Sequence, residues 1–166
     1  MKEIILGNGT FYIGEDAIGL TRGGGQFVIE KEYRDIVADG DRGRVKGRTN
    51  QDRSSPKLTI NQLEIVPENL PKMYAAVKAT KEDGKTTITG KGNIDTADYQ
   101  DVVKFVGETK SGREVVIKVL NAINLENFDW TLADKDEVIA ALTYEGCYLE
   151  DSPKDFEPWE VEFADE

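Results

Sequence analysis

The chain has 166 residues, of which 39% are hydrophobic and 32% are charged, with a formal net charge of -11 at pH 7. A chain of this length most simply forms one domain, residues 1–166, with a substantial core. Its one cysteine, Cys147, excludes an internal disulfide framework and fits a small buried hydrophobe in a reducing compartment. Histidine is absent, which excludes an ordinary Ser-His-Asp triad. The sequence contains no apolar run that would span a bilayer, and its opening residues do not resemble a signal peptide.

The charge is unevenly distributed along the chain. Residues 121–166 contain 14 acidic and 2 basic side chains, a net of -12. Residues 1–120 contain 18 acidic and 19 basic side chains, a net of +1. Unlike charges on separate regions favour head-to-tail binding between copies of one molecule. A solvated acidic tail that only keeps the protein soluble explains the same counts equally well.

In chain order, short strands are expected at residues 3–6 and 11–13, with glycine turns around them. Residues 26–65 then begin and end with strand-like alternation. Between these ends lies a polar segment too long for an ordinary connection, which indicates function or disorder. We name residues 38–57 the basic arm. If the arm is extended, the four cations at alternate positions from residue 42 to residue 48 project to one side. The candidate contacts to an acidic surface on another subunit are Arg42, Arg44, Lys46, Arg48, Arg53 and Lys57.

A helix is predicted over residues 66–80. Pro67 suits its first turn, and apolar residues recur at helical spacing at Leu70, Met73, Tyr74 and Val77. Such a stripe indicates core packing, so the helix is expected to cover one face of a sheet.

The second half of the chain is predicted to consist of strands. A strand at 86–89 precedes a hairpin whose arms, 101–109 and 113–121, are rich in valine and isoleucine and are joined by Lys110-Ser111-Gly112. Residues 138–148 predict a last long strand, although their alanines and leucine also fit a helix. The terminal sequence Trp159-Glu160-Val161-Glu162-Phe163 alternates as a strand does. The fold class is therefore mainly β (α+β), with one flanking helix.

Motifs for catalysis and cofactor binding are weak. Gly84-Lys85-Thr86 resembles part of a phosphate-binding loop, but Ala79 stands where that motif needs a glycine. The acids between residues 129 and 137 lack the spacing and the glycine of a calcium loop. No two carboxylates stand out as a glycosidase pair. We expect no enzyme activity, no cofactor and no metal, and an acid-type hydrolase is the least favoured reading.

Nucleic acid is an alternative partner for the basic arm, with Arg44 and Arg48 on phosphates. The chain as a whole is acidic, however, and the arm lacks the interleaved aromatic side chains on which single strands stack. A partner protein, or another copy of this chain, is the better expectation.

The stretch from Glu30 to Ile65 resembles the major tail tube proteins of tailed bacteriophages. The features that carry the resemblance run in order. They are the strand Val28-Ile29-Glu30-Lys31-Glu32-Tyr33-Arg34, the turn Ala38-Asp39-Gly40, the basic element Gly43 to Arg48, the strand Pro56 to Asn61 leading into Leu63-Glu64-Ile65, and Asn69-Leu70. Ile18-Gly19 and the turn from Thr21 to Gly24 also look like these proteins. The resemblance covers the first half of the chain well and the second half only by its strand pattern.

The resemblance implies a β-sandwich or partly rolled β-barrel flanked by one helix, close to the subunit of the type VI secretion tube. It implies hexameric rings stacked into a hollow tube through which DNA passes without specific binding, and a long loop that reaches neighbouring subunits. The implied location is the virion tail, assembled in the bacterial cytoplasm without membrane anchoring. The implied partners are other copies of the chain, a tape measure protein in the lumen, tail terminator and baseplate or distal tail proteins, and a sheath protein in a contractile particle.

Two further groups of residues are assigned as candidates under this reading. The hairpin residues expected at the lumen wall are Val103, Phe105, Val115, Ile117 and Val119. The acidic segment at residues 150–166 is the expected counterpart of the arm, through Glu150, Asp151, Asp155 and Glu157. Alternatives are the inner tube of a contractile phage-derived particle (tailocin or secretion tube) and a soluble acidic protein-binding module.

Overall fold

The computed structural model describes residues 2–165 and is built almost entirely from strands. The strands, in chain order, are β1 (Ile5–Ile13), β2 (Asp16–Ala17), β3 (Thr21–Asp35), β4 (Thr49–Gln62), β5 (Val77–Glu82), β6 (Lys85–Gly90), β7 (Gln100–Thr109), β8 (Glu114–Asn124), β9 (Ala140–Glu145) and β10 (Trp159–Phe163). The short helices are the 3₁₀ turns η1 (Pro67–Asn69) and η2 (Thr96–Asp98), and the α-helix α1 (Leu70–Met73). The predicted mainly β fold is confirmed.

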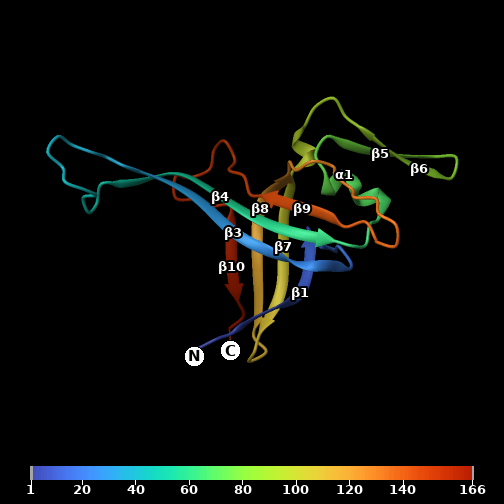
Figure 1. Cartoon of the computed structure of the whole chain (residues 1–166), viewed down its shortest axis with the longest axis horizontal. Helices are drawn as coiled ribbons and strands as arrows, with labels where there is room; N and C mark the ends of the chain where they lie inside the picture. Colours follow the sequence, from blue (N-terminus) through green and yellow to red (C-terminus); the bar gives the residue numbers. More distant parts are fainter. Residues whose placement is uncertain (1, 166) are drawn as a thin grey trace.

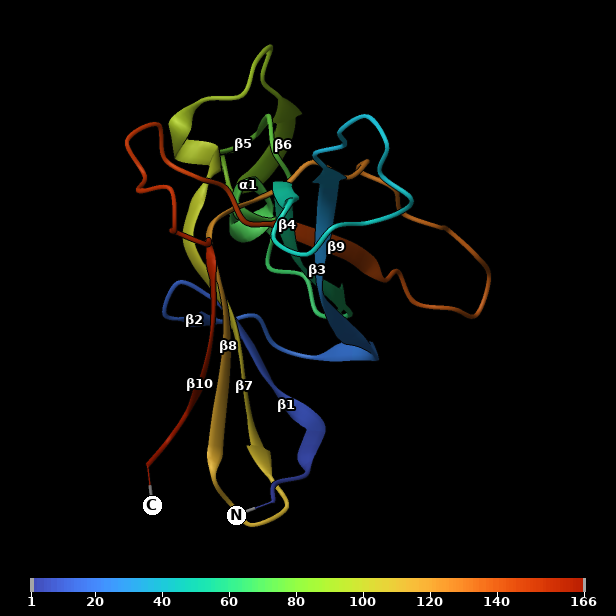
Figure 2. The ribbon, with the colours of Figure 1, turned by 90° about the vertical axis from the view of Figure 1, so that its left-hand side faces the viewer.

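Strand β8 joins two antiparallel layers. Along residues 115–119 it pairs with β7 on one side and with β10 on the other, and at residues 123–124 it pairs instead with β9. The first layer is β2-β1-β7-β8-β10, and the second continues from the end of β8 through β9 and β4 to β3. Figure 2 shows the first layer running down to the end of the molecule where both termini lie. The arrangement is sandwich-like, with one strand shared between the layers.

The core lies between the two layers. Strands β1, β7 and β8 contribute alternate residues, and β4 and β9 contribute theirs from the opposite side, because successive side chains of a strand point to opposite faces. The buried set includes Phe11, Ile13, Leu58, Ile60, Val103, Phe105, Val119, Leu142 and Tyr144. Burying apolar side chains of this size contributes about 1.5–3 kcal/mol each, which makes this layer contact the main source of stability.

The helix predicted at residues 66–80 is shorter than expected. Regular α-helix covers only Leu70–Met73, after the turn η1. Ala76 then adopts a left-handed backbone with φ of 56°, and Val77 pairs with Gly90 in the separate β5–β6 ribbon. Leu70, Met73 and Tyr74 are buried as predicted, since one helical turn is enough to place them against the core.

Several strand boundaries also differ from the prediction. The two strands expected at residues 3–6 and 11–13 are one strand, β1, which passes through Gly7 and Gly9. Strand β9 ends at Glu145, so the long strand expected at residues 138–148 is reduced to the six residues that pair with β4. The hairpin β7–β8 and the terminal strand β10 form where they were predicted.

Candidate assembly surfaces

The basic arm is the end of a long hairpin. Strands β3 and β4 pair from Thr21–Gln62 out to Asp35–Thr49 and project well beyond the body of the molecule (Figure 1). Residues 49–57, the second half of the basic arm, belong to β4, so the irregular part is confined to residues 36–48. We name residues 36–48 the arm tip. Gly40 and Gly47, both with φ near 90°, allow the turns that fold this tip.

The cations of the arm do not form a free stripe on one side. Arg48 Nη2 lies 2.7 Å from Asp41 Oδ1, and Arg44 Nε lies 3.0 Å from Asp35 Oδ2. The hydrogen bond from Arg44 is the main reason that the pKa of Asp35 is below its ordinary value. The arm tip carries turns at residues 39–40 and 46–47 and is not an extended strand, so the predicted alternation fails there.

The two cations nearest the body are also paired internally. Lys57 Nζ contacts Glu30 Oε2 at 3.0 Å across the β3–β4 ladder, and this contact raises the pKa of Lys57. Arg53 Nη2 lies 3.9 Å from Glu145 Oε1. Among residues 2–165, only Arg42 and Lys46 of the six predicted contacts have no ion-pair partner. These two cations are therefore the ones still available to a partner.

The hairpin residues assigned to the lumen wall lie in the core instead. Val103, Val115 and Val119 are fully buried, Phe105 is 8% exposed, and Ile117 is half-buried against the same cluster. Alternation along a strand puts these five side chains on the inner face of the first layer. Four of the five are closed to a surface contact in the folded chain and Ile117 is only half-exposed, so the lumen assignment is corrected accordingly.

The opposite face of the same hairpin is the one that meets solvent. Lys118 contacts Glu162 at 2.8 Å and Glu160 at 3.9 Å, and Lys104 contacts Glu15 at 3.6 Å. Glu108 and Glu114 lie opposite each other on the same face near the turn. We name this surface the outer face of the first layer. The charged groups just named on it, all within residues 2–165, are five carboxylates and two ammonium groups.

The predicted acidic counterpart lies beside the base of the arm of its own molecule. Glu157 accepts hydrogen bonds from Gln51 at 3.0 Å and from Tyr148 at 3.2 Å, which ties the 146–158 loop to β4. Glu150, Asp151 and Asp155 are exposed. They lie outside any strand of the structure.

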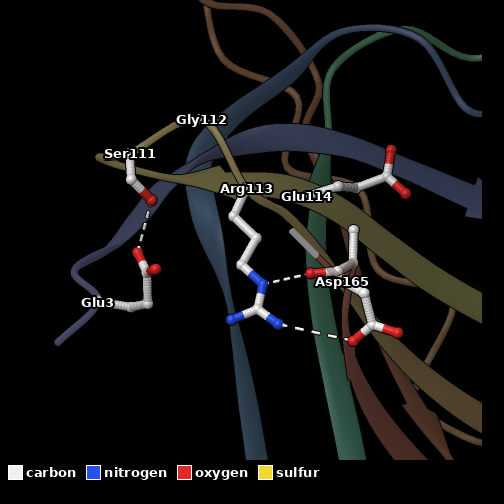
Figure 3. Close-up of a pocket in the computed structure, with 7 residues that line it drawn as sticks. Glu3, Ser111, Gly112, Arg113, Glu114 and Asp165 are labelled. Atoms are coloured by element: carbon white, nitrogen blue, oxygen red, sulfur yellow. Dashed lines mark hydrogen bonds and ion pairs between the residues drawn. The ribbon is translucent and has the colours of Figure 1, made fainter. Parts of the chain in front are cut away.

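A hollow of about 620 Å³ marks the end of the first layer, where both chain ends meet the β7–β8 turn. Figure 3 shows Arg113 directed at the C-terminal residues, bonding the carbonyl of Ala164 and lying 3.9 Å from Asp165. Ser111 donates to Glu3 at 2.7 Å, and this bond lowers the pKa of Glu3. These contacts fasten the two ends of the described chain to one turn.

The loop at residues 125–139 was not assigned as a site from the sequence. It presents Leu125, Phe128 and Leu132 to solvent, while Trp130 Nε1 and Tyr74 Oη, 3.3 Å apart, anchor it to the body. Its length and its mixture of acids with large apolar residues were the signals that could have identified it.

Comparison with known proteins gives no identification: no family model matches the chain, and no curated protein matches it. Within residues 2–165, no group of three or more carboxylate or thiol side chains is arranged to hold a metal ion. None of the helices in that range is long and apolar enough to cross a membrane. The thiol of Cys147 is half-buried, and burial raises its pKa.

Proposed function

We propose that the chain is a structural, non-enzymatic subunit of a hollow tube, the tail tube of a bacteriophage or a phage-derived particle. In this proposal, hexameric rings stack head to tail, and DNA passes from the capsid to the host through the lumen. The observation that carries it is that the residues resembling tail tube proteins, Glu30 to Ile65, fall on one structural unit. That unit is the projecting hairpin of β3, the arm tip and β4, with the three residues 63–65 that follow it.

Open strand edges support the proposal. Strand β3 is 15 residues long and pairs with β4 alone, and β10 pairs with β8 alone, within the described chain. Exposed edges of this length tend to pair with another chain unless they are covered. Edge pairing between subunits around an axis closes a barrel and removes the edges.

The charge on the outer face of the first layer suits a conduit for a polyanion. If this face lines the lumen, its three excess carboxylates repel phosphate and keep DNA from adhering. Because Val103 and its neighbours lie in the core, the outer face is the side of this hairpin that meets solvent, which supports this role for it.

Electron microscopy of the purified protein tests the proposal. Rings or tubes of uniform width are expected over a range of salt concentrations. A protein that stays monomeric at millimolar concentration in every buffer contradicts it. Tubes that carry an added sheath protein indicate the contractile alternative, the inner tube of a tailocin or secretion machine.

A soluble acidic protein-binding module is the second candidate. The exposed apolar side chains of the 125–139 loop, set among carboxylates, favour it. A monomer that binds a basic peptide through this loop and forms no ring supports this candidate over the tube.

A further inference from the structure

The arm tip contains a hollow of about 400 Å³ with an unusual lining. Its aliphatic wall is formed by Ile36, Val37 and Val45, all of which are more than a third exposed. Arg42, Arg44 and Arg48 line the same hollow together with Asp35 and Asp41. These two carboxylates pair with Arg44 and Arg48, so Arg42 is the lining cation that has no ion-pair partner among residues 2–165. A surface of this kind suits an aliphatic side chain flanked by carboxylates, because apolar contact supplies affinity and charge supplies orientation.

The chain itself carries such a group on the 125–139 loop. Leu132 is 82% exposed, the highest value among the large apolar side chains of the described residues. Asp129 and Asp134 flank it in the sequence, and neither forms an ion pair within residues 2–165. Two other acids of the loop, Asp136 and Glu137, already share one cation, Arg22, at 3.8 and 2.9 Å.

The placement of the two features excludes a contact within one molecule. Figure 1 shows the arm tip at one end of the long axis and the 125–139 loop toward the other end. A group at one end of a molecule that fits a hollow at the other end joins copies head to tail.

The other acidic and apolar loop, residues 146–158, fits this role less well. Leu149 is 56% exposed, and its backbone N–H is tied to Ser152 Oγ at 2.9 Å. This loop also lies on the side of the molecule from which the arm projects, held to Gln51 through Glu157. In a head-to-tail row it therefore faces away from the copy whose arm would dock on this molecule.

We infer that Leu132 of one copy inserts into the arm-tip hollow of another, with Asp129 and Asp134 facing Arg42 and Lys46. The inference rests on the proposed self-assembly. It names the surface that contacts the arm of the neighbouring copy as the 125–139 loop, in place of the acidic segment at residues 150–166. The contact buries four exposed aliphatic side chains and pairs two cations that lack a partner in the free chain.

Cysteine cross-linking tests the contact directly. In a Cys147→Ser background, one protein carries Val37→Cys and is ¹⁵N-labelled, and the second carries Leu132→Cys. A matched control second protein carries Leu149→Cys. Mild oxidation is expected to yield roughly tenfold more mixed disulfide with Leu132→Cys than with Leu149→Cys, because docking raises the local thiol concentration. Equal yields, or a higher yield with Leu149→Cys, overturn the inference.

Charge exchange provides the second measurement. Arg42→Glu with Lys46→Glu is expected to weaken self-association about tenfold in sedimentation velocity, since like charges then face each other. Adding Asp129→Lys with Asp134→Lys to that protein restores association, whereas adding Glu150→Lys with Asp151→Lys does not. The inference is overturned if Glu150→Lys with Asp151→Lys restores self-association, or if neither pair of substitutions restores it.

The same proteins separate this inference from the proposed function. If electron microscopy shows tubes of the wild-type protein but the Leu132→Cys cross-link does not form, the docking contact is wrong and the proposed tube stands. If the cross-link forms but no rings or tubes are seen, the proposed tube is wrong and a head-to-tail contact between copies stands.

Discussion

The ring of Phe105 occupies the space directly above Gly9. A Cβ placed on Gly9 would lie 2.6 Å from Cζ of Phe105 and 2.3 Å from the carbonyl oxygen of Val106. Gly107, the residue opposite Gly9 in the β1–β7 ladder, is covered by the same ring. Two glycines that face each other across two strands thus make room for one aromatic side chain of the core. This packing explains why β1 continues through Gly9 as a strand.

Gly9→Ala is therefore expected to destabilise the protein. The added methyl group meets backbone as well as the ring, so neither can move away cheaply, and the cost is about 1–3 kcal/mol. Urea unfolding followed by fluorescence measures it. Gly7→Ala is the matched control in the same strand, because a Cβ there meets nothing within 4 Å in the described chain. Equal stability of the two variants contradicts the packing account.

Tyr144 makes the stability depend on pH in alkali. Its side chain is fully buried, its hydroxyl donates to the carbonyl of Lys72 at 3.0 Å, and burial raises the pKa of the phenol strongly. The unfolded chain has the ordinary tyrosine pKa near 10. The stabilisation is thus complete below pH 10 and is lost as the pH rises from there toward the folded pKa.

Tyr144→Phe is expected to flatten this alkaline loss while lowering stability at neutral pH by about 1 kcal/mol, since the carbonyl of Lys72 loses its partner. Urea unfolding at several pH values measures both effects. Tyr33→Phe, an exposed position on β3, is the control and changes neither. An unchanged pH profile in Tyr144→Phe contradicts the role of burial.

Asp98 is expected to set an acid limit on stability. Burial by itself raises the pKa of Asp98, but hydrogen bonds from Lys91 Nζ at 2.8 Å and from the Asp95 backbone at 2.9 Å outweigh it, so the pKa is lowered. Stability from this group is present above the unfolded pKa near 3.9 and is lost as the pH falls through the lower folded value.

Asp98→Asn removes a charge-assisted bond in a site that is 6% exposed, and it is expected to cost about 2 kcal/mol at pH 7. The difference from wild type shrinks at low pH, which thermal unfolding at pH 7 and pH 3 checks. Glu68→Gln, which breaks only the exposed 3.9 Å pair with Lys81, serves as control and leaves the unfolding temperature unchanged. A cost that is the same at both pH values rules out the ionised carboxylate as its source.

Arg113 is expected to hold the C-terminal strand. Its guanidinium bonds the carbonyl of Ala164 and lies over the ring of Phe163, with its central carbon 5.8 Å from the ring centroid. Arg113→Ala should speed removal of the last residues by a carboxypeptidase several-fold, followed by mass spectrometry, because β10 is an edge strand held on one side. Lys110→Ala on the neighbouring turn is the control. If Arg113→Ala and Lys110→Ala are digested at the same rate, the pairing of β10 with β8 is sufficient to hold the strand and Arg113 is not needed.

The sequence alone determined those elements whose signals are local. The hairpin β7–β8 was predictable because alternating valines and isoleucines flank a three-residue turn ending in Gly112, whose φ is 88°. The irregular arm tip was predictable because residues 38–48 carry one large apolar side chain, Val45, and so have little to bury. The two-sided pattern of Trp159 to Phe163 likewise identified β10.

Only the tertiary structure decided which face of a strand is buried and which charges are free. The period-2 pattern of Val103 and Phe105 fits an inner face as well as a lumen wall, and the second layer decides in favour of the core. One helical turn is enough to bury Leu70, Met73 and Tyr74 at helical spacing. The same spacing continues to Val77, so the pattern did not reveal that β5 begins there. Arg48 and Arg44 count as free cations in a sequence, but the folded hairpin brings Asp41 and Asp35 beside them. Local periodicity records what one segment prefers, whereas burial and ion pairing depend on which distant segment packs against it.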